Sequence, residues 1–555
     1  MKPILIFPKP EIKKRPIGKR QARAKQHIPS HARQKVRLVT AFNLLETNFN
    51  NGILSVDPAG YAPERTLVFE TAGSIDDFYN AVSKIAGLYF LQEILGADFE
   101  PDDDYYTINK KGQKKDTTQK SFVYLTMANQ KALNQIMSYW NNYKNQEDFK
   151  FPNGLAPLGH LFDHLKNIRF WDTDDRLYNT GLTEDWKIRV AEGQDVVPVE
   201  IELWYKLDNE VRTSKETRIR KLIKKLGGNV LTTCVIGEIH YHSVLVSIPV
   251  KSISQFFQDN PSEIELMRCD EVMFFRPSGQ CMTPLFQADK EHEYIDENPK
   301  DKYDEILNEP IVALLDGLPL GHHDWIKEHI IIDDPDGWSS AYSPKDQKHG
   351  TSMASLIIRG DMQSAQPAIS RKLYCRPILK PENTFSGDSI ERIPEGVLPI
   401  DLVHRAVRRM FETEDDNITA PTIKVINLSI ADPKRLFEYQ MSPWAKLIDY
   451  LSVKYKVLFV ISAGNHIYDL ELGITNEEFN KLSSDDTEAL IIKCISDTTH
   501  LRRLMSPAES INALTIGAYH HDEFSGHINP YFDRNMPSTI NPVTWGKKGQ
   551  LNLNY

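Results

Sequence analysis

The sequence predicts an α/β protein whose C-terminal part, residues 311–555, contains a parallel sheet with helices on both faces. Two features predict this sheet. Short, nearly continuous apolar segments occur at 311–316, 373–379, 423–430, 456–465 and 513–518. Helical stretches separate them, among them 401–412 and 444–453. Strands that are apolar throughout are buried on both faces, which is typical of a parallel sheet covered by helices.

The composition is that of a globular protein, with 41% hydrophobic and 26% charged residues. A net charge of −10 produces no field that would attract nucleic acid, so no nucleic-acid partner is expected. No stretch approaches the ~18 apolar residues that span a bilayer, and the apolar run 4–7 is too short for a signal peptide. Five cysteines form no CxxC pair, which indicates reduced thiols and no structural metal. We therefore expect a cytoplasmic protein without membrane contact.

The N-terminal part divides into a basic segment and a longer segment of mixed character. Residues 1–40 form a basic arm with twelve Lys or Arg and one acid; a solvated tail and an arm that docks on an acidic partner both remain open. Residues 41–195 predict a mixed α/β region of unknown role, with helices at 74–95 and 133–143. His160 and His164 would share one helix face, but no third ligand accompanies them, so a metal site is not expected.

Residues 197–276 predict the order β-α-β-β-α-β, which is that of the ferredoxin-like plait. The predicted strands are 199–206, 229–237, 240–250 and 263–275, and the predicted helices are 215–225 and 250–259. Residues 277–310 follow as an exposed acidic linker, because 284–310 hold nine acids and three lysines.

Polar groups follow the strands of the predicted parallel sheet. Asp316 ends the first strand, where α/β proteins place catalytic groups, although an Asp before glycine also suits a turn. His349 opens a helix, where the alternative is a capping role. Asn465 follows Gly464 at the end of a later strand, and its amide can donate to an oxyanion.

In this order, five segments closely resemble the subtilisin-like serine proteases (subtilases, S8 type). They are VALLDG at 312–317, HGTSMA at 349–354, KVINLS at 424–429, VISAGN at 460–465 and SPAESINALTIGA at 506–518. The resemblance covers 311–555. It implies that Asp316 orients His349, that His349 is the general base, and that Asn465 binds the oxyanion.

The resemblance also implies a substrate cleft for an extended polypeptide, which would pair with the cleft as an added strand. Its lining would be Ser429, Ile430, Ala431, Ser462, Ala463 and Gly464. Two positions depart from the family pattern. Gly317 follows the Asp where a small hydroxyl residue is usual, and Ala431 stands where a glycine is usual.

Further expectations come from the same resemblance. The plait at 197–276 would be a prodomain-type module that caps the protease; an unrelated plait is the alternative. Subtilases often bind calcium, but no metal site is identified in this sequence, so no cofactor is expected. Chains of this build resemble bacterial proteins encoded beside AAA-type ATPases, which suggests such an ATPase as a partner.

The family places its nucleophilic serine after the oxyanion Asn, in a Gly-Thr-Ser-Met-Ala segment. The only Gly-Thr-Ser here is 350–352. Ser352 follows His349 by three residues, whereas the chain order of the triad requires the serine last, so Ser352 is not assigned as the nucleophile. Ser525 and Ser538 lack a Gly-Thr partner and a following apolar helix. We expect that residues 1–555 lack the nucleophile segment, and with it the end of the fold.

Three explanations remain open for the missing serine: a truncated protease, a pseudoprotease, and a fold completed by a second chain. The predicted function is a subtilisin-like serine endopeptidase, which hydrolyses peptide bonds with an Asp-His-Ser triad and is inactive as this chain alone. The alternative is a non-catalytic pseudoprotease that binds peptides or a partner.

Overall fold

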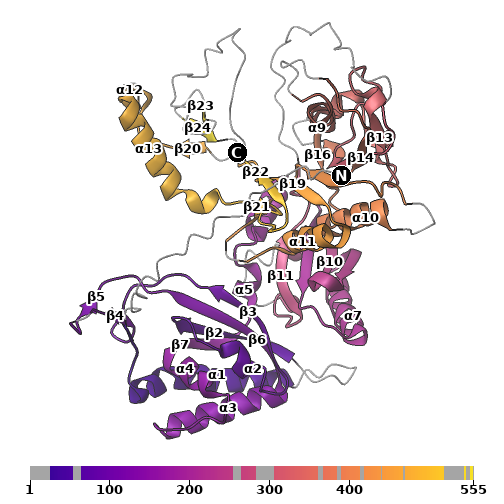
Figure 1. Cartoon of the computed structure of the whole chain (residues 1–555). Helices are drawn as coiled ribbons and strands as arrows, with labels where there is room; N and C mark the ends of the chain where they lie inside the picture. Colours follow the sequence, from indigo (N-terminus) through magenta and orange to yellow (C-terminus); the bar gives the residue numbers. More distant parts are fainter. Residues whose placement is uncertain are drawn as a thin grey trace. The chain divides into compact units, whose positions relative to one another are not determined.

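The computed structural model describes residues 25–53, 64–109, 111–253, 264–282, 306–360, 367–383, 389–412, 418–438, 440–466, 469–479, 481–517, 543–545 and 550–553 (Figure 1). The chain divides into two compact units, Met1–Trp171 and Asp172–Tyr555. Within the described ranges, no helix combines the length and the apolar character needed to cross a membrane.

The first unit is built on an antiparallel sheet in the order β3-β6-β2-β7. Its strands are β2 (Glu64–Ala72), β3 (Leu88–Leu95), β6 (Ser121–Asn129) and β7 (Leu165–Phe170). Its helices are α1 (His31–Ile53), α2 (Phe78–Val82), α3 (Gln130–Asn145) and α4 (Ala156–His164), and they share one apolar core with the sheet. A smaller sheet joins β1 (Lys25–His27), β4 (Tyr106–Ile108) and β5 (Lys114–Lys115).

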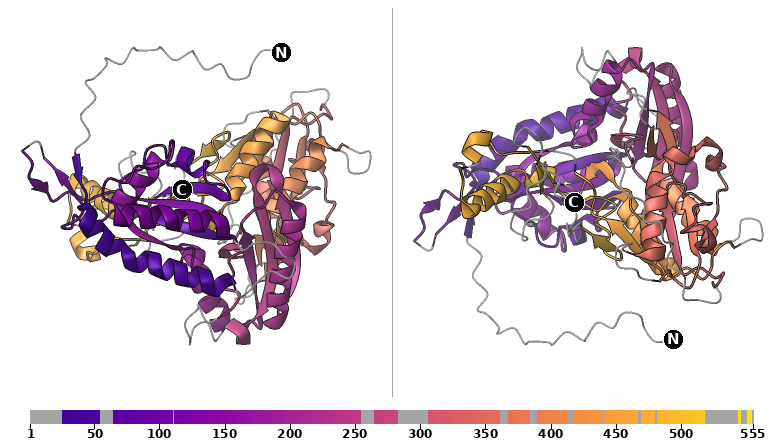
Figure 2. Two further views of the ribbon diagram at one scale, coloured as in Figure 1. Left: turned by 90° about the horizontal axis from the view of Figure 1, so that it is seen from below. Right: turned by 90° about the horizontal axis from the view of Figure 1, so that it is seen from above.

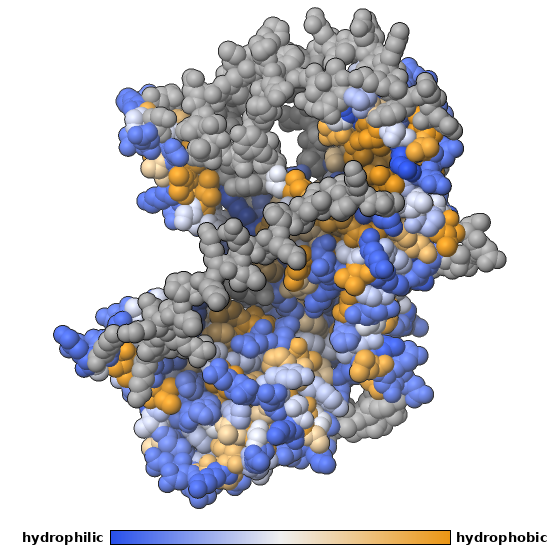
Figure 3. All heavy atoms as spheres, in the orientation of Figure 1, coloured by the Kyte–Doolittle hydropathy of each residue, from blue (hydrophilic) through white to orange (hydrophobic). Residues whose placement is uncertain are grey.

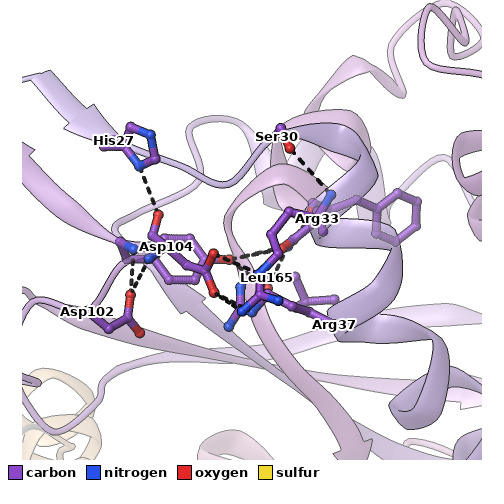
Figure 4. Close-up of polar contacts among 10 residues, drawn as sticks. His27, Ser30, Arg33, Arg37, Asp102, Asp104 and Leu165 are labelled. Carbon is purple, nitrogen blue, oxygen red and sulfur yellow. Dashed lines mark hydrogen bonds and ion pairs between the residues drawn. The ribbon is translucent and has the colours of Figure 1, made fainter.

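Residues 31–40 were predicted as part of the basic arm, and this is wrong because they begin helix α1. The helix buries apolar side chains at helical spacing, namely Leu38, Phe42, Leu45 and Phe49. On another face, Arg33 and Arg37 pair with Asp104 at 3.1 and 3.2 Å (Figure 4). The positive charges of this segment therefore belong to an amphipathic helix, and residues 1–24 of the predicted arm lie outside the described part.

The helix predicted over 74–95 is also wrong for most of its length. Only Phe78–Val82 is helical, and Leu88–Leu95 forms strand β3, which pairs with β6. Gly87 separates the two with a φ of +84°, which ends any helical continuation. The helix predicted at 133–143 is confirmed as α3, which buries Leu133, Ile136 and Trp140.

The face of this unit turned to the viewer in Figure 3 is mainly hydrophilic.

The second unit begins with helices α5 (Thr173–Leu177) and α6 (Leu182–Ala191) and continues as the plait. The plait consists of β8 (Val196–Leu203), α7 (Asn209–Lys225), β9 (Asn229–Ile236), η1 (Gly237–Ile239), β10 (Tyr241–Pro249) and β11 (Val272–Pro277). Its antiparallel sheet has the order β11-β8-β10-β9, so the first and third strands are central. Leu182 and Trp186, which sequence analysis grouped with the N-terminal region, pack into the plait core.

The end of the plait agrees with prediction only in part. Residues 250–253 are helical, as predicted, and the rest of the predicted second helix lies outside the described residues. The last strand begins at Val272 and not at 263, because residues 264–271 form turns that bury Leu266, Met267 and Cys269 in the core. The start of the predicted exposed linker is buried as well, since Gln280 and Cys281 are 7% and 1% exposed. Residues 283–305 lie outside the described part.

The remainder of the second unit is built on a parallel sheet, six-stranded within the described residues, in the order β13-β14-β12-β17-β19-β22. Its strands are β12 (Val312–Asp316), β13 (Ile330–Ile332), β14 (Leu373–Pro377), β17 (Val425–Leu428), β19 (Leu458–Ser462) and β22 (Leu514–Ile516). All of the predicted strands belong to this sheet; β13 was not predicted.

Helices cover both faces of the sheet, as predicted (Figure 2). On one face, Leu314 packs with Ala354 and Ile358 of α9 (Lys348–Arg359). On the other face, Ala313 and Leu315 pack with α10 (Pro399–Phe411) and α11 (Pro443–Tyr455). Leu314 faces opposite to Ala313 and Leu315 because successive side chains of a strand point to opposite faces of the sheet.

The second unit also contains shorter elements. They are η3 (Lys327–His329), η4 (Trp338–Ala341), η5 (Pro344–Asp346), β15 (Lys380–Asn383), β16 (Ser389–Arg392), β18 (Asp432–Leu436), β20 (Asp469–Glu471), α12 (Asn476–Phe479), α13 (Ser484–Asp497), η7 (Thr499–Leu501), β21 (Met505–Ser506), β23 (Val543–Trp545) and β24 (Gln550–Leu553). The hairpin β15–β16 lies between β14 and α10 in sequence and contributes to the site described next.

Candidate active site

Asp316 is the last residue of β12, and its side chain is fully buried. Its Oδ1 accepts hydrogen bonds from the N–H of Gly317 and from Nδ1 of His349, both at 2.6 Å. Its second oxygen, Oδ2, is also buried and has no hydrogen-bond partner among the described residues. A buried carboxylate is costly unless it is hydrogen-bonded, so the His349 contact stabilises this arrangement.

His349 is the second residue of α9 and is 8% exposed. A carboxylate can only accept, so Nδ1 carries the proton, and Nε2 carries the lone pair of the neutral ring. Burial lowers the pKa of His349, but the hydrogen bond to Asp316 and the charges of Asp316 and Glu391 outweigh burial and raise it above 6.5. The ring is therefore oriented and made more basic, as a general base requires.

Two neighbouring residues explain why α9 comes so close to the end of β12. A Cβ atom at Gly350 would lie 2.2 Å from the carbonyl oxygen of Gly317. Thr351 accepts a hydrogen bond from the N–H of Leu320 at 2.9 Å and donates to the carbonyl of Gln347. The small residues after His349 therefore let the helix dock against the loop that follows Asp316.

Glu391, which sequence analysis did not identify, is the third ionisable group at this site. It lies on β16, is 5% exposed, and accepts the backbone N–H of His349 at 3.2 Å and the hydroxyl of Tyr342 at 3.1 Å. Burial raises the pKa of Glu391 to about 7, and the charge of Asp316 adds to this effect. The one signal in the sequence was Gly317, because a Cβ there would lie 1.9 Å from Oε1 of Glu391.

Ser352 is exposed on α9, three residues after His349. Its carbonyl accepts a hydrogen bond from Ser355. Ser525 and Ser538 lie outside the described residues.

The structure places Asn465 beyond the end of β19, where it is exposed. The register pairs Leu315 with Leu428 and Leu428 with Ile461, so Asp316, Ser429 and Ser462 come level at the carboxyl edge of the sheet. Asn465 follows this edge by three residues. Parallel strands thus bring the predicted acid and the predicted oxyanion donor to one edge.

The predicted cleft residues differ in their surroundings. Ile430 is buried, whereas Ser429 and Ala431 are partly exposed. The backbone of Ala463 is already used inside the fold, because its N–H donates to Ile516 and its carbonyl accepts from Met505. The prediction that Ala463 pairs with a substrate backbone is therefore wrong for this conformation.

Gly464 has a φ of +106° and lies against the side chain of Met505. A Cβ at this position would lie 2.6 Å from Sδ of Met505. Position 464 therefore has no room for a side chain. The roles of Ser429, Ile430, Ala431, Ser462 and Gly464 in a substrate cleft stay predictions.

Among the described residues, no three His, Cys, Asp or Glu side chains gather as they would around a metal ion. His164, one of the pair considered in the sequence, instead places Nδ1 2.9 Å from the carbonyl oxygen of Ala72.

The fold and the site define an α/β domain with an acid–base pair at the carboxyl edge of a parallel sheet. Residues 308–544 match the model of the Subtilase family (peptidase S8). This match confirms the resemblance predicted from the five motifs: this part of the chain is a subtilisin-like, peptidase-type domain. No protein with a curated description matches the sequence.

One solved structure that is similar to the chain is an unknown protein from Galdieria sulphuraria. The identity is 13%, the TM-score is 0.12, and the match covers 37% of this chain and 92% of that chain.

Replacing Asp316 with Asn is expected to lower the pKa of His349. The substitution removes the negative charge and the charge-assisted hydrogen bond that oppose burial, while burial itself remains. The measurement is a histidine ring titration by NMR on selectively labelled protein. The control is Asp324→Asn, because Asp324 is exposed and pairs with Lys327, three residues away. An unchanged midpoint for His349 in Asp316→Asn would show that the pair is not coupled.

Proposed function

We propose that the chain is a subtilisin-like serine endopeptidase in which Asp316 orients His349 and His349 acts first as general base and then as general acid. The observation that carries this proposal is the 2.6 Å contact between Asp316 Oδ1 and His349 Nδ1, inside a region that matches the Subtilase family. Asn465 would donate its side-chain amide to the oxyanion of the tetrahedral intermediate. The substrate is a polypeptide in extended conformation, and no cofactor takes part.

The plait is proposed as a prodomain-type module that caps the peptidase domain. Three contacts support this role. Ile236, Ile239 and Tyr241 share an apolar core with residues of α10 and α11, and Tyr450 of α11 donates to Glu238 at 3.3 Å. The segment after β11 runs beside the hairpin strand that carries Glu391, since Ile393 donates its N–H to the carbonyl of Cys281 at 2.9 Å.

The nucleophile is not assigned to a serine of this sequence. Ser352 is set aside because one short helix segment would have to supply both the base and the nucleophile, whereas the triad uses separate elements. We further propose a cytoplasmic protein, on the basis of its composition and its few, unpaired cysteines. A bacterial origin and an AAA-type ATPase as partner are proposed from the resemblance of the sequence.

A polypeptide of residues 1–555 is expected not to be labelled by a fluorophosphonate probe, because such probes react with an activated serine. It is also expected to show no turnover of a casein substrate, since loss of one triad member removes nearly all of the acceleration. The comparison is a product that includes any codons following residue 555 in the gene.

Labelling of that longer product, abolished by His349→Ala, would support the endopeptidase. Labelling of the 1–555 polypeptide itself would contradict the absence of a nucleophile, and Ser352→Ala would then identify the residue. Peptide binding without labelling of either product would favour the non-catalytic alternative.

A further inference from the structure

Glu391 is a buried carboxylate that the general description of an Asp-His pair does not use. It reaches the site from β16, on a hairpin that lies between β14 and α10 in the sequence. Its Oε2 accepts the backbone N–H of His349, which is one of the first N–H groups of α9 and has no partner within the helix. An anion at this end of a helix is also favoured by the helix dipole.

The volume that Glu391 occupies is made available by Gly317. A Cβ at this position would lie 1.9 Å from Oε1 and 2.8 Å from Cδ of Glu391. Residue 317 and Glu391 therefore compete for one space beside Asp316. Since residue 317 has no side chain, it offers no hydroxyl to Asp316, and Oδ2 of Asp316 has no hydrogen-bond partner in the described part of the chain.

The groups around Glu391 fix its carboxylate on several sides. Asp316 comes from β12, His349 from α9, and Tyr342 from the segment between η4 and η5. The hydroxyl of Tyr342 lies 3.1 Å from Oε1 and 3.0 Å from the carbonyl oxygen of Leu379, and it can donate to either. On the partner strand β15 the opposite residue is the uncharged Pro381. Arg392, the next residue on β16, is directed to Glu382 and Glu395 instead.

We propose that Glu391 is a positioning residue for His349: a second carboxylate that holds the histidine backbone, occupies the space left by Gly317, and makes the basicity of the ring depend on its own ionisation. The proposal deepens the proposed function and rests on the role of His349 as base. Above about pH 7 Glu391 is ionised, and its charge adds to that of Asp316 in favouring the protonated ring. Below that pH Glu391 is neutral, and of the two carboxylates only Asp316 favours the protonated ring.

The test is a titration of the His349 ring in the 555-residue polypeptide carrying ¹³C-labelled histidine, with the resonance assigned by its loss in His349→Gln. In the unmodified protein we expect the titration curve of the His349 ring to show a second inflection at about pH 7, because His349 and Glu391 are coupled. In Glu391→Gln the second inflection should disappear and the midpoint of the ring should shift to lower pH. The matched control is Glu382→Gln on the same hairpin, which should leave the His349 curve unchanged.

Gly317→Ala tests the same idea while the carboxylate remains in the protein. The added Cβ must displace Glu391 from His349 and Tyr342, so the ring midpoint should shift in the same direction as in Glu391→Gln. In the double variant Gly317→Ala/Glu391→Ala the space is free, and the melting temperature should equal that of Glu391→Ala alone.

Protein stability gives an independent measure. The pKa of Glu391 is raised from 4.5 to about 7, so the native state holds its proton more tightly than the unfolded state. The melting temperature should therefore fall as pH rises through this window, and the fall should be smaller in Glu391→Gln.

A His349 curve in Glu391→Gln that superimposes on the unmodified one would overturn the proposal, as would an equal shift in Glu382→Gln. Neither result would affect the Asp316→Asn and fluorophosphonate tests, which address the proposed function itself.

Discussion

Replacing Arg435 with Met is expected to lower the free energy of unfolding by about 3–5 kcal/mol, because it leaves buried carboxylates without their cation. Arg435 lies on β18 and is 8% exposed. Its guanidinium pairs with Glu200 of β8 in the plait and, at 3.4 Å, with Asp432. The ion pair therefore links the plait to β18, which follows strand β17 of the parallel sheet in sequence, inside one compact unit.

The ionisation of Glu200 and Asp432 depends strongly on Arg435. Burial would raise the pKa of Glu200, but the charge of Arg435 and the hydrogen bond from Tyr241, at 2.7 Å, hold it below its usual value. Burial raises the pKa of Asp432 even with Arg435 present. Without the arginine, both carboxylates should bind protons in the native state, so the loss of stability should be smaller at pH 5 than at pH 8.

Urea unfolding at the two pH values measures this effect. The matched control is Arg405→Met, since Arg405 is 44% exposed in its pair with Asp401 and should contribute about 0–1 kcal/mol. Adding Glu200→Gln to Arg435→Met should recover part of the stability. Equal stability of Arg435→Met and Arg405→Met would contradict the view that this pair holds the plait to β18.

Gly350→Ala is expected to destabilise the protein by about 3 kcal/mol, although Ala is intrinsically the better helix former by ~1 kcal/mol. The new Cβ would lie 2.2 Å from the carbonyl oxygen and 2.6 Å from the carbonyl carbon of Gly317. These are backbone atoms and cannot rotate away, so α9 has to move from the end of β12. The contact between His349 and Asp316 should lengthen as a result.

Two measurements separate this outcome from a general loss of stability. The melting temperature should fall, and the pKa of His349 should fall with it because the hydrogen bond to Asp316 weakens. Gly396→Ala is the control, since no atom lies within 4 Å of a Cβ placed there. A Gly350→Ala protein with an unchanged His349 titration would show that the close approach of α9 does not position the ring.

Local patterns were sufficient for much of the fold. The strands of the parallel sheet were predicted because continuous apolar runs are characteristic of strands buried on both faces. Asp316 and His349 were identified because each stands in a short motif at the end of a strand or the start of a helix. The structure places their side chains 2.6 Å apart although 33 residues separate them in the chain.

Other parts could not be predicted because the local pattern favoured one structure, whereas contacts with segments elsewhere in the chain stabilised another. The run 88–95 has an apolar spacing that suits a helix, yet it forms β3 because it pairs with β6, more than twenty residues later. Residues 31–40 were judged by their charge, while the apolar stripe that makes them helical continues as far as Phe49. The backbone of Ala463 is engaged by Met505 and Ile516, which no pattern near Ala463 indicates.

By itself, the sequence determined the strands β12, β14, β17, β19 and β22 of the parallel sheet, the resemblance to subtilases, and the Asp316–His349 pair, because periodicity and motifs are properties of neighbouring residues. Only the tertiary structure decided that Glu391 fills the space at Gly317 and that Arg435 meets Glu200, which is 235 residues away in the chain. Burial and the pairing of charges depend on which distant segments come together. For this reason, Glu391, which we propose to position His349, and the ion pair between Arg435 and Glu200 became visible only in the folded chain.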